Sequence, residues 1–242
     1  MRGLVITGFP RSGTTLALRV LCPGLSPGQM SAGGLVNEPR EVSEALATGN
    51  PGEVSSSIKS SLNNGFGIVK HPFLSFALSR MEPKFRVLSI FRDLREVVCS
   101  VYVHHNRSSV VGDDNSWKAW APFDFSMSRM ERVVAAWKSA HLSVLGYRGE
   151  LEVWSYGFWK GWRVECDDIS STYPDARESS AGVIEDVARG ATFSESGSGR
   201  ENWQSLVEKK EVGPDEIMLV KRVQDEVMRA YYGKGIEVFT RW

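Results

Sequence analysis

Short apolar segments alternate along this chain with longer segments whose apolar residues recur every three or four positions. A short apolar run between turn residues is typical of a buried strand, and a spacing of three or four is typical of one face of a helix. The pattern predicts strands over residues 3–7, 66–72, 85–91 and 151–154. It predicts helices over residues 16–21, 41–47, 54–62, 73–81, 94–103, 127–145, 181–189 and 214–232.

The alternation of strands and helices indicates the fold class. A strand, a helix and a second strand in this order form a right-handed crossover between parallel strands. We therefore expect a three-layer α/β fold in which helices flank a mostly parallel sheet. A chain of 242 residues is long for one domain but not clearly two, and we expect a single domain over residues 1–242.

The longest helical pattern, over residues 127–145, carries one apolar stripe with a Trp and a His in it. Its members are Met130, Val133, Val134, Trp137, His141, Leu142 and Leu145. Because a stripe of this kind faces the core of a globular domain, we expect Trp137 and His141 to be core residues rather than catalytic ones.

A turn between two glycines, Gly8 and Gly13, joins the first predicted strand to the first predicted helix. The first amides of a helix have no partner within the helix, and the helix dipole favours negative charge there, so this turn predicts a phosphate site. The alternative is a strand–turn–helix connection whose glycines only permit a positive φ. The candidate ligands for the anion are Arg11, Ser12, Gly13, Thr14 and Thr15.

The spacing of this turn is that of a P-loop, but Thr14 stands where nucleoside triphosphatases carry a lysine. That substitution argues against ordinary ATP or GTP hydrolysis. A positive charge is still present as Arg11, whose planar fork suits phosphate or sulfate oxygens.

Further polar residues follow the second and third predicted strands. Lys70 and His71 stand at the end of one strand, and Arg92 follows the other. Because ligands of parallel sheets collect at the carboxyl ends of the strands, we expect these residues to share one crevice with the loop after Ile6.

Composition and charge exclude several classes of protein. Lys plus Arg and Asp plus Glu both number 29, so nothing indicates a nucleic-acid partner gripped over a broad surface. The cysteines, Cys22, Cys99 and Cys166, are odd in number and widely spaced, which argues against a disulfide framework or a zinc site. No apolar run approaches about 20 residues. We expect a cytoplasmic protein without a membrane anchor.

A polar, glycine-containing segment over residues 106–126 ends in aromatic residues. Long loops in compact domains are often functional, so a lid or acceptor-binding flap is one interpretation, and hydrophobic packing on the sheet is the other. Its aromatic residues, Trp117, Trp120, Phe123 and Phe125, could stack on sterols, phenols, glycans or peptides alike.

The glycine-framed loop at residues 9–16 and the segment at residues 90–102, which contains Arg92 and Ser100, together resemble two motifs of the sulfotransferases that use 3'-phosphoadenosine 5'-phosphosulfate (PAPS) as donor. Residues 9–16, Phe-Pro-Arg-Ser-Gly-Thr-Thr-Leu, resemble the family's 5'-phosphosulfate loop. Residues 90–102 resemble its 3'-phosphate motif, with Arg92 and Ser100 eight positions apart. Leu94 departs from the proline that is frequent there. The resemblance implies a fold like that of P-loop NTPases, PAPS as donor, adenosine 3',5'-bisphosphate (PAP) as product, and no required metal.

The resemblance is looser towards the carboxyl end. Phe193 resembles the aromatic residue that contacts adenine, and residues 197–203 resemble the glycine-rich loop that closes over the 3'-phosphate. The usual Arg-Lys-Gly opening of that loop is absent, so Arg200 is the candidate for its charge.

Sulfuryl transfer needs a base for the acceptor and cations for the developing charge. Family members use a His or a carboxylate as base, so Glu38 and His71 are both candidates. We favour Glu38 because it lies in the loop after the first helix, as the carboxylate base does in the bacterial and tyrosylprotein branches that the chain resembles. Lys70 and Arg11 would stabilise the bridging and equatorial oxygens. The acceptor, a small molecule, glycan or peptide with a hydroxyl or amine, and the oligomeric state do not follow from the sequence.

Two other functions remain open at this point. One is a P-loop nucleotide kinase in which Asp93, after the third predicted strand, holds magnesium. The other is a protein that binds PAP or PAPS without catalysing transfer.

Overall fold

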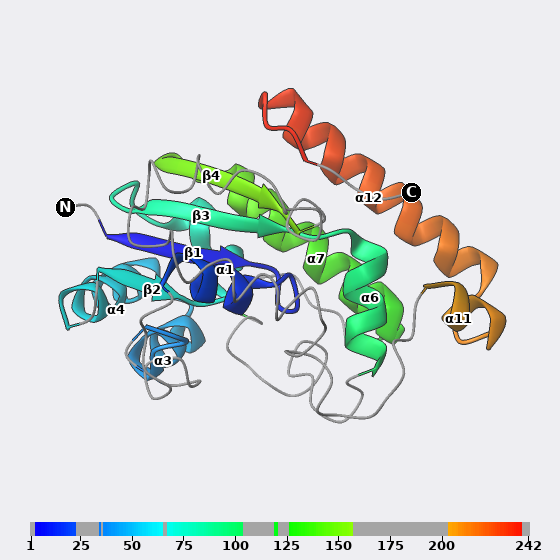
Figure 1. Ribbon diagram of the computed structural model, residues 1–242, viewed down its shortest axis with the longest axis horizontal. Helices are drawn as coiled ribbons and strands as arrows, with labels where there is room; N and C mark the ends of the chain where they lie inside the picture. Colours follow the sequence, from blue (N-terminus) through cyan, green and yellow to red (C-terminus); the bar gives the residue numbers. More distant parts are fainter. Residues whose placement is uncertain are drawn as a thin grey trace.

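The computed structural model describes residues 3–22, 34, 36–64, 67–103, 119–120, 126–156 and 203–238. Within these residues, four parallel strands form a sheet that is flanked by helices (Figure 1). The predicted α/β fold with a parallel sheet between helices is therefore confirmed.

The elements follow one another as alternating strands and helices. The strands are β1 (Leu4–Gly8), β2 (Ile68–Lys70), β3 (Arg86–Phe91) and β4 (Glu150–Ser155). Before β3 lie α1 (Thr14–Leu21), α3 (Arg40–Thr48), α4 (Pro51–Asn64), α5 (Leu74–Ala77) and the 3-10 helix η1 (Leu78–Arg80). After β3 lie α6 (Leu94–Val103), α7 (Arg129–Leu145), α11 (Trp203–Glu208) and α12 (Pro214–Gly233).

The strand order is β2-β1-β3-β4, so β1 is a central strand. All of its residues are buried, as expected for the apolar run Leu-Val-Ile-Thr-Gly with neighbours on both sides. In the register, Ile6 is opposite Lys70, and Gly8 is opposite Ile90. The ends of β2 and β3 therefore lie on either side of the loop that follows β1.

The segment over residues 36–38 pairs with the outer edge of β2 through an isolated bridge between Asn37 and Lys70. Lys70 N donates to Val36 O and Glu38 N donates to Lys70 O, each at 2.7 Å, in a parallel bridge. This pairing brings Glu38 to the carboxyl end of β2, 32 residues before its partner in the sequence.

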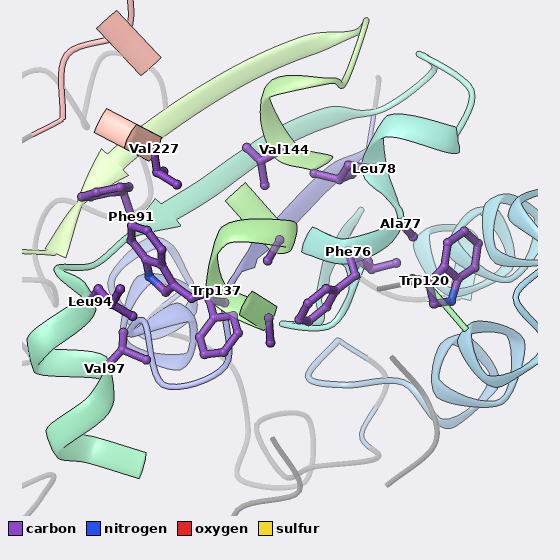
Figure 2. Close-up of a cluster of buried hydrophobic side chains, with 14 of the residues drawn as sticks. Phe76, Ala77, Leu78, Phe91, Leu94, Val97, Trp120, Trp137, Val144 and Val227 are labelled. Atoms are coloured by element: carbon purple, nitrogen blue, oxygen red, sulfur yellow. The ribbon is translucent and has the colours of Figure 1, made fainter. Parts of the chain in front are cut away.

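Each face of the sheet has its own core. On one face, Leu4, Ile6, Leu88 and Ile90 pack against α1 and Tyr156. The larger core, on the other face, includes Val5, Val87 and Phe91 with side chains of α3 to α7 and α12. Figure 2 shows part of it, where Phe91 and Trp137 lie close to Leu94, Val97 and Val227.

Most predicted elements agree with the structure to within a few residues, and the predicted helix over residues 94–103 has the bounds of α6. The predicted helix over residues 73–81 is shorter and ends in η1. Leu142, predicted on the core stripe of α7, is 42% exposed, whereas Trp137 and His141 are buried as expected. Trp203, predicted at the end of a loop, begins α11 and packs against the larger core.

Some expectations lie outside the described residues. These are the helix over residues 181–189, most of the aromatic segment over residues 106–126, Phe193 and Arg200. A single domain over residues 1–242 also stays a prediction. Among the described helices, none combines the length and apolarity that crossing a membrane requires.

Candidate active site

The loop between β1 and α1 has a backbone that requires its two glycines. Gly8 has φ 146° and Gly13 has φ 96°, both in the range that favours glycine. A Cβ on Gly8 would meet Ile90 O and Ser12 Oγ at 2.6 Å, and one on Gly13 would meet the Tyr156 ring at 2.5 Å. The glycines therefore do more than permit a positive φ: they also allow the loop to pack closely against β3 and Tyr156.

The same loop presents unsatisfied donors to an anion. Ser12 is fully buried, and its Oγ has no hydrogen-bond partner among the described residues. Helix α1 begins at Thr14 with no side-chain cap and no acidic residue in its first turn. Because an unpaired buried hydroxyl is costly and free helix amides attract negative charge, this geometry fits a phosphate or a sulfuryl group. Thr14 is buried and Thr15 half-buried in that first turn.

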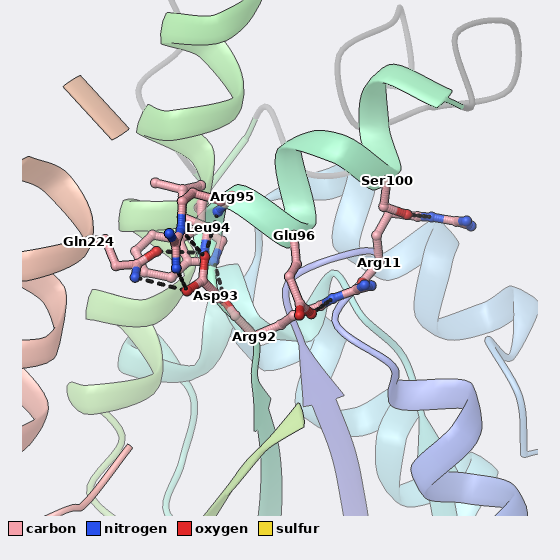
Figure 3. A network of polar contacts seen from close by, with 9 residues as sticks. Arg11, Arg92, Asp93, Leu94, Arg95, Glu96, Ser100 and Gln224 are labelled. Atoms are coloured by element: carbon pink, nitrogen blue, oxygen red, sulfur yellow. Dashed lines mark hydrogen bonds and ion pairs between the residues drawn. The ribbon is translucent and has the colours of Figure 1, made fainter. Parts of the chain in front are cut away.

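Two arginines lie at the loop: Arg11 contacts Ser100, and Arg92 contacts the backbone of Arg11 (Figure 3). Arg11 Nε donates to Ser100 Oγ at 3.1 Å, and Arg92 Nη1 donates to Arg11 O at 2.6 Å. Arg92 also pairs with Glu96, Nε to Oε2 at 3.0 Å. Desolvation, and secondly the charge of Arg92, lower the pKa of Arg11. An anion between the two cations would relieve this unfavourable pairing.

Tyr156 completes this side of the site, and the sequence analysis assigned it no role. Arg92 Cζ lies 4.3 Å from the centre of the Tyr156 ring, a cation–π contact, and Tyr156 is buried next to Gly13. The available signal was its position: Tyr156 directly follows β4, as Arg92 directly follows β3.

Lys70 and Glu38 form an ion pair on the opposite side of the loop. Lys70 is 1% exposed, and its Nζ lies 2.5 Å from Glu38 Oε1. The pKa of Lys70 is lowered, because the effect of burial is larger than the opposing effect of the Glu38 carboxylate. Glu38 has φ 55°, a conformation that is strained for a residue with a Cβ. Two of the three non-glycine residues with positive φ in the described chain, Arg11 and Glu38, thus belong to the predicted site.

His71 lies deeper than Glu38. It is 2% exposed, and its Nε2 is 2.9 Å from Ser43 Oγ on α3. Its backbone is also bound on both sides, since His71 N donates to Ile6 O and Thr7 Oγ1 donates to His71 O. The Glu38 side chain is 32% exposed, so it is the more accessible of the two candidate bases.

Asp93 has several partners within the protein. Its carboxylate accepts hydrogen bonds from Arg95 N, Nε and Nη2 and from Gln224 Nε2. It is 6% exposed at the start of α6. A carboxylate engaged in this way acts as a helix cap, which disfavours the kinase hypothesis in which Asp93 holds magnesium.

Of the aromatic segment, the described residue Trp120 lies in the larger core. It is 4% exposed, its Nε1 donates to Leu46 O at 2.7 Å, and Arg80 Cζ lies 5.7 Å from its ring centre. Trp120 is therefore a core residue, while the interpretation of the segment as a lid or flap stays a prediction.

The structure thus brings Arg92 and Ser100 to the loop after β1, which contains Arg11, Ser12 and Gly13 and leads into Thr14 and Thr15 of α1. Glu38, Lys70 and His71 lie at the carboxyl end of the neighbouring strand β2. In comparisons with known proteins, the family model described as "Sulfotransferase domain" matches residues 2–149. The matched range contains all of these residues. Neither the search of curated proteins nor that of solved structures gave a match.

Proposed function

Because the chain belongs to the sulfotransferase domain family, we propose that it transfers the sulfuryl group of PAPS to a hydroxyl or amine of an acceptor. The family supports sulfuryl transfer in general. The donor, the acceptor class and the roles of individual residues are our proposal. The observation that carries it is the hydrogen-bonded series Arg92–Arg11–Ser100 next to the unpartnered buried hydroxyl of Ser12.

The donor would lie across the loop after β1. Ser12, the first amides of α1, Thr14 and Thr15 fit its 5'-phosphosulfate, since this is where buried donors lack partners. Arg92 and Ser100 would hold the 3'-phosphate by a charge-assisted fork and a hydroxyl. Bound PAPS would supply an activated sulfuryl group, with PAP as the leaving group. From the resemblance, Phe193 would contact adenine and Arg200 the 3'-phosphate.

Glu38 is the proposed base that takes the proton of the acceptor. Its side chain is about one-third exposed, whereas His71 is buried with Nε2 at Ser43 Oγ. A base must reach the acceptor, and accessibility therefore favours Glu38. Lys70 Nζ, beside Glu38 Oε1, and the Arg11 guanidinium would stabilise negative charge on the bridging and equatorial oxygens. His71 then has a structural role that links β2 to α3.

The first test is calorimetric titration of PAP into the protein without added metal. We expect micromolar binding that Arg92→Ala weakens by several kcal/mol, as for a lost charge-assisted contact. Arg86→Ala is the matched control, because Arg86 lies at the opposite end of the same strand and pairs with Glu150 and Glu152. It should leave PAP binding unchanged. Binding would justify a screen of small-molecule, glycan and peptide acceptors with labelled PAPS.

The same titrations distinguish the alternatives. A kinase should bind ADP with magnesium in preference to PAP. A binding protein without turnover should bind PAP and PAPS but transfer sulfate to no acceptor, and the retained Glu38–Lys70 pair argues against it. The cytoplasmic setting stays a prediction, and the free thiols of Cys22 and Cys99 are consistent with it.

A further inference from the structure

Gln224 of α12 is fully buried and makes two hydrogen bonds to the junction between β3 and α6. Its Oε1 accepts from Leu94 N at 2.8 Å, and its Nε2 donates to Asp93 Oδ2 at 3.1 Å (Figure 3). These contacts join segments 130 and 131 residues apart. They give both polar groups of one buried amide a partner, which is the arrangement that a buried glutamine requires.

The two contacts complete the cap of α6. The first amides of a helix need partners from outside the helix, and Asp93 Oδ1 takes one by accepting from Arg95 N at 2.9 Å. Leu94, the first residue of α6, receives its partner from Gln224 instead. The start of α6 is thus held by its own Asp93 and by a residue of α12.

The capped turn carries the proposed 3'-phosphate ligands. Arg92 immediately precedes Asp93, and Ser100 lies within α6. The Arg92 carbonyl is bound as well, because Trp137 Nε1 donates to it at 3.2 Å. The backbone that directly follows Arg92 is therefore held by α7, through Trp137, and by α12, through Gln224.

We propose that Gln224 is a positioning residue for the 3'-phosphate site. It sets where α6 begins relative to β3, and hence how Arg92 and Ser100 face one anion. A preorganised fork binds more tightly because less ordering is needed when the ligand arrives. This role rests on the proposed function, since the ligand of Arg92 is the 3'-phosphate of PAPS or PAP.

If Gln224 only stabilised the fold, its replacement would lower the thermal midpoint without a specific effect on PAP binding. Tyr231 provides the matched control for this distinction. Tyr231 lies seven residues later on α12, is also fully buried, and its hydroxyl hydrogen-bonds His141 Nδ1 on α7 at 2.8 Å. Tyr231→Phe removes a buried hydrogen bond from the same helix without touching the turn at Arg92. Both variants should lower the thermal midpoint, but only the Gln224 variant should weaken PAP binding.

The test is a double-mutant cycle with Gln224→Met and Arg92→Ala, read out by calorimetric titration of PAP. We expect Gln224→Met to weaken PAP binding by about tenfold in the wild-type background, and by less than about twofold in the Arg92→Ala background, where the fork is already gone. Tyr231→Phe should stay within about twofold of wild type. Asp93→Asn attacks the same contacts from the turn and should repeat the loss if Gln224→Met fails to fold.

The outcomes separate the two proposals. Equal losses in both backgrounds, wild-type affinity in Gln224→Met, or the same loss in Tyr231→Phe would overturn the positioning role while leaving the donor site in place. A wild-type protein that does not bind PAP would overturn the donor site, and the role of Gln224 with it.

Discussion

Two buried basic side chains in this protein, Lys70 and His141, have the same exposure but different partners. Lys70 and His141 are each 1% exposed. Lys70 lies at the carboxyl end of β2 and pairs with the Glu38 carboxylate. His141 is on α7 and contacts α12 and β3: its Nδ1 lies 2.8 Å from the Tyr231 hydroxyl, and its ring centre is 4.4 Å from that of Trp137 and 5.0 Å from that of Phe91.

The difference shows how location decides the protonation state of a buried group. Burial lowers the pKa of His141 to about 3, so the ring is neutral near neutral pH, and an aromatic core suits a neutral ring. Burial also lowers the pKa of Lys70, but the carboxylate of Glu38 opposes that shift. The charged pair, Lys70 and Glu38, lies at the edge of the sheet where ligands of such folds bind. The neutral pair, His141 and Tyr231, lies in the core.

The largest effect is expected from removing the cation of the charged pair. Lys70→Met should slow sulfuryl transfer by about 10²–10³-fold, the usual cost of one electrostatic group. Its thermal midpoint should change little, because the Glu38 carboxylate that loses its partner is about one-third exposed and remains hydrated, while the buried ammonium is replaced by an apolar side chain of similar length. Transfer of label from PAPS, with an acceptor from the screen, measures the rate. Lys138→Met, on the surface of α7, is the control.

Removing the carboxylate should lower stability as well as activity, unlike removing the cation. Glu38→Ala leaves Lys70 buried without its counter-ion, and we expect it to cost about 3 kcal/mol of the free energy of unfolding. Adding Lys70→Met to this variant should restore most of the loss, because the unpaired charge is then removed. Urea titrations of both single variants and the double variant measure the effect. A double variant as unstable as Glu38→Ala would contradict the interpretation.

Burial of neutral His141 should affect how the free energy of unfolding depends on pH. The folded-state pKa of His141 is about 3 and its ordinary value is 6.5, so the unfolded chain binds a proton more readily. This contribution is complete above pH 6.5 and is lost as the pH falls, by about 2 kcal/mol at pH 5. His141→Gln, which does not titrate, should lose about that much less between pH 7 and pH 5. Equal losses in urea titrations of wild type and variant would rule this out.

The smallest effect concerns the strained backbone of the site. Arg11→Gly should raise the free energy of unfolding by about 0.5–1 kcal/mol, because φ 73° suits glycine, while it weakens PAP binding. Lys210→Gly is the matched control, since Lys210 has φ 57° outside the site. It should bring a similar gain in stability with unchanged PAP affinity. If Arg11→Gly lowered the thermal midpoint, strain at Arg11 would not be stored for function.

The elements of the fold were largely predictable because they are encoded locally. The bounds of α6 follow from the spacing of Leu94, Val97, Val98 and Val101, all of which are buried. The residues that follow each strand were predictable for a similar reason, since parallel strands end at the same edge of the sheet. Two element predictions were less accurate: the predicted helix over residues 73–81 ends in the 3-10 helix η1, and α11 was not predicted.

The pairings within the site were not predictable in the same way. Sequence reasoning named Glu38, Lys70 and His71 but could not tell that Lys70 pairs with Glu38 and His71 with Ser43. Those contacts depend on the bridge between residues 36–38 and β2, for which no periodic pattern exists. Tyr156 and Gln224 were missed because their partners are distant in the chain: Arg92 for Tyr156, and Asp93 and Leu94 for Gln224.

The sequence by itself determined the alternation of strands and helices, the glycine-framed loop and the pair of motifs that contain Arg11 and Arg92. Each depends on neighbours within a few residues, where spacing, turn chemistry and helix periodicity act directly. Only the tertiary structure decided which side chains meet: Lys70 with Glu38, Arg92 with Tyr156, and Asp93 with Gln224. These contacts depend on strand order and helix packing, because the order β2-β1-β3-β4 determines which strand ends lie next to one another.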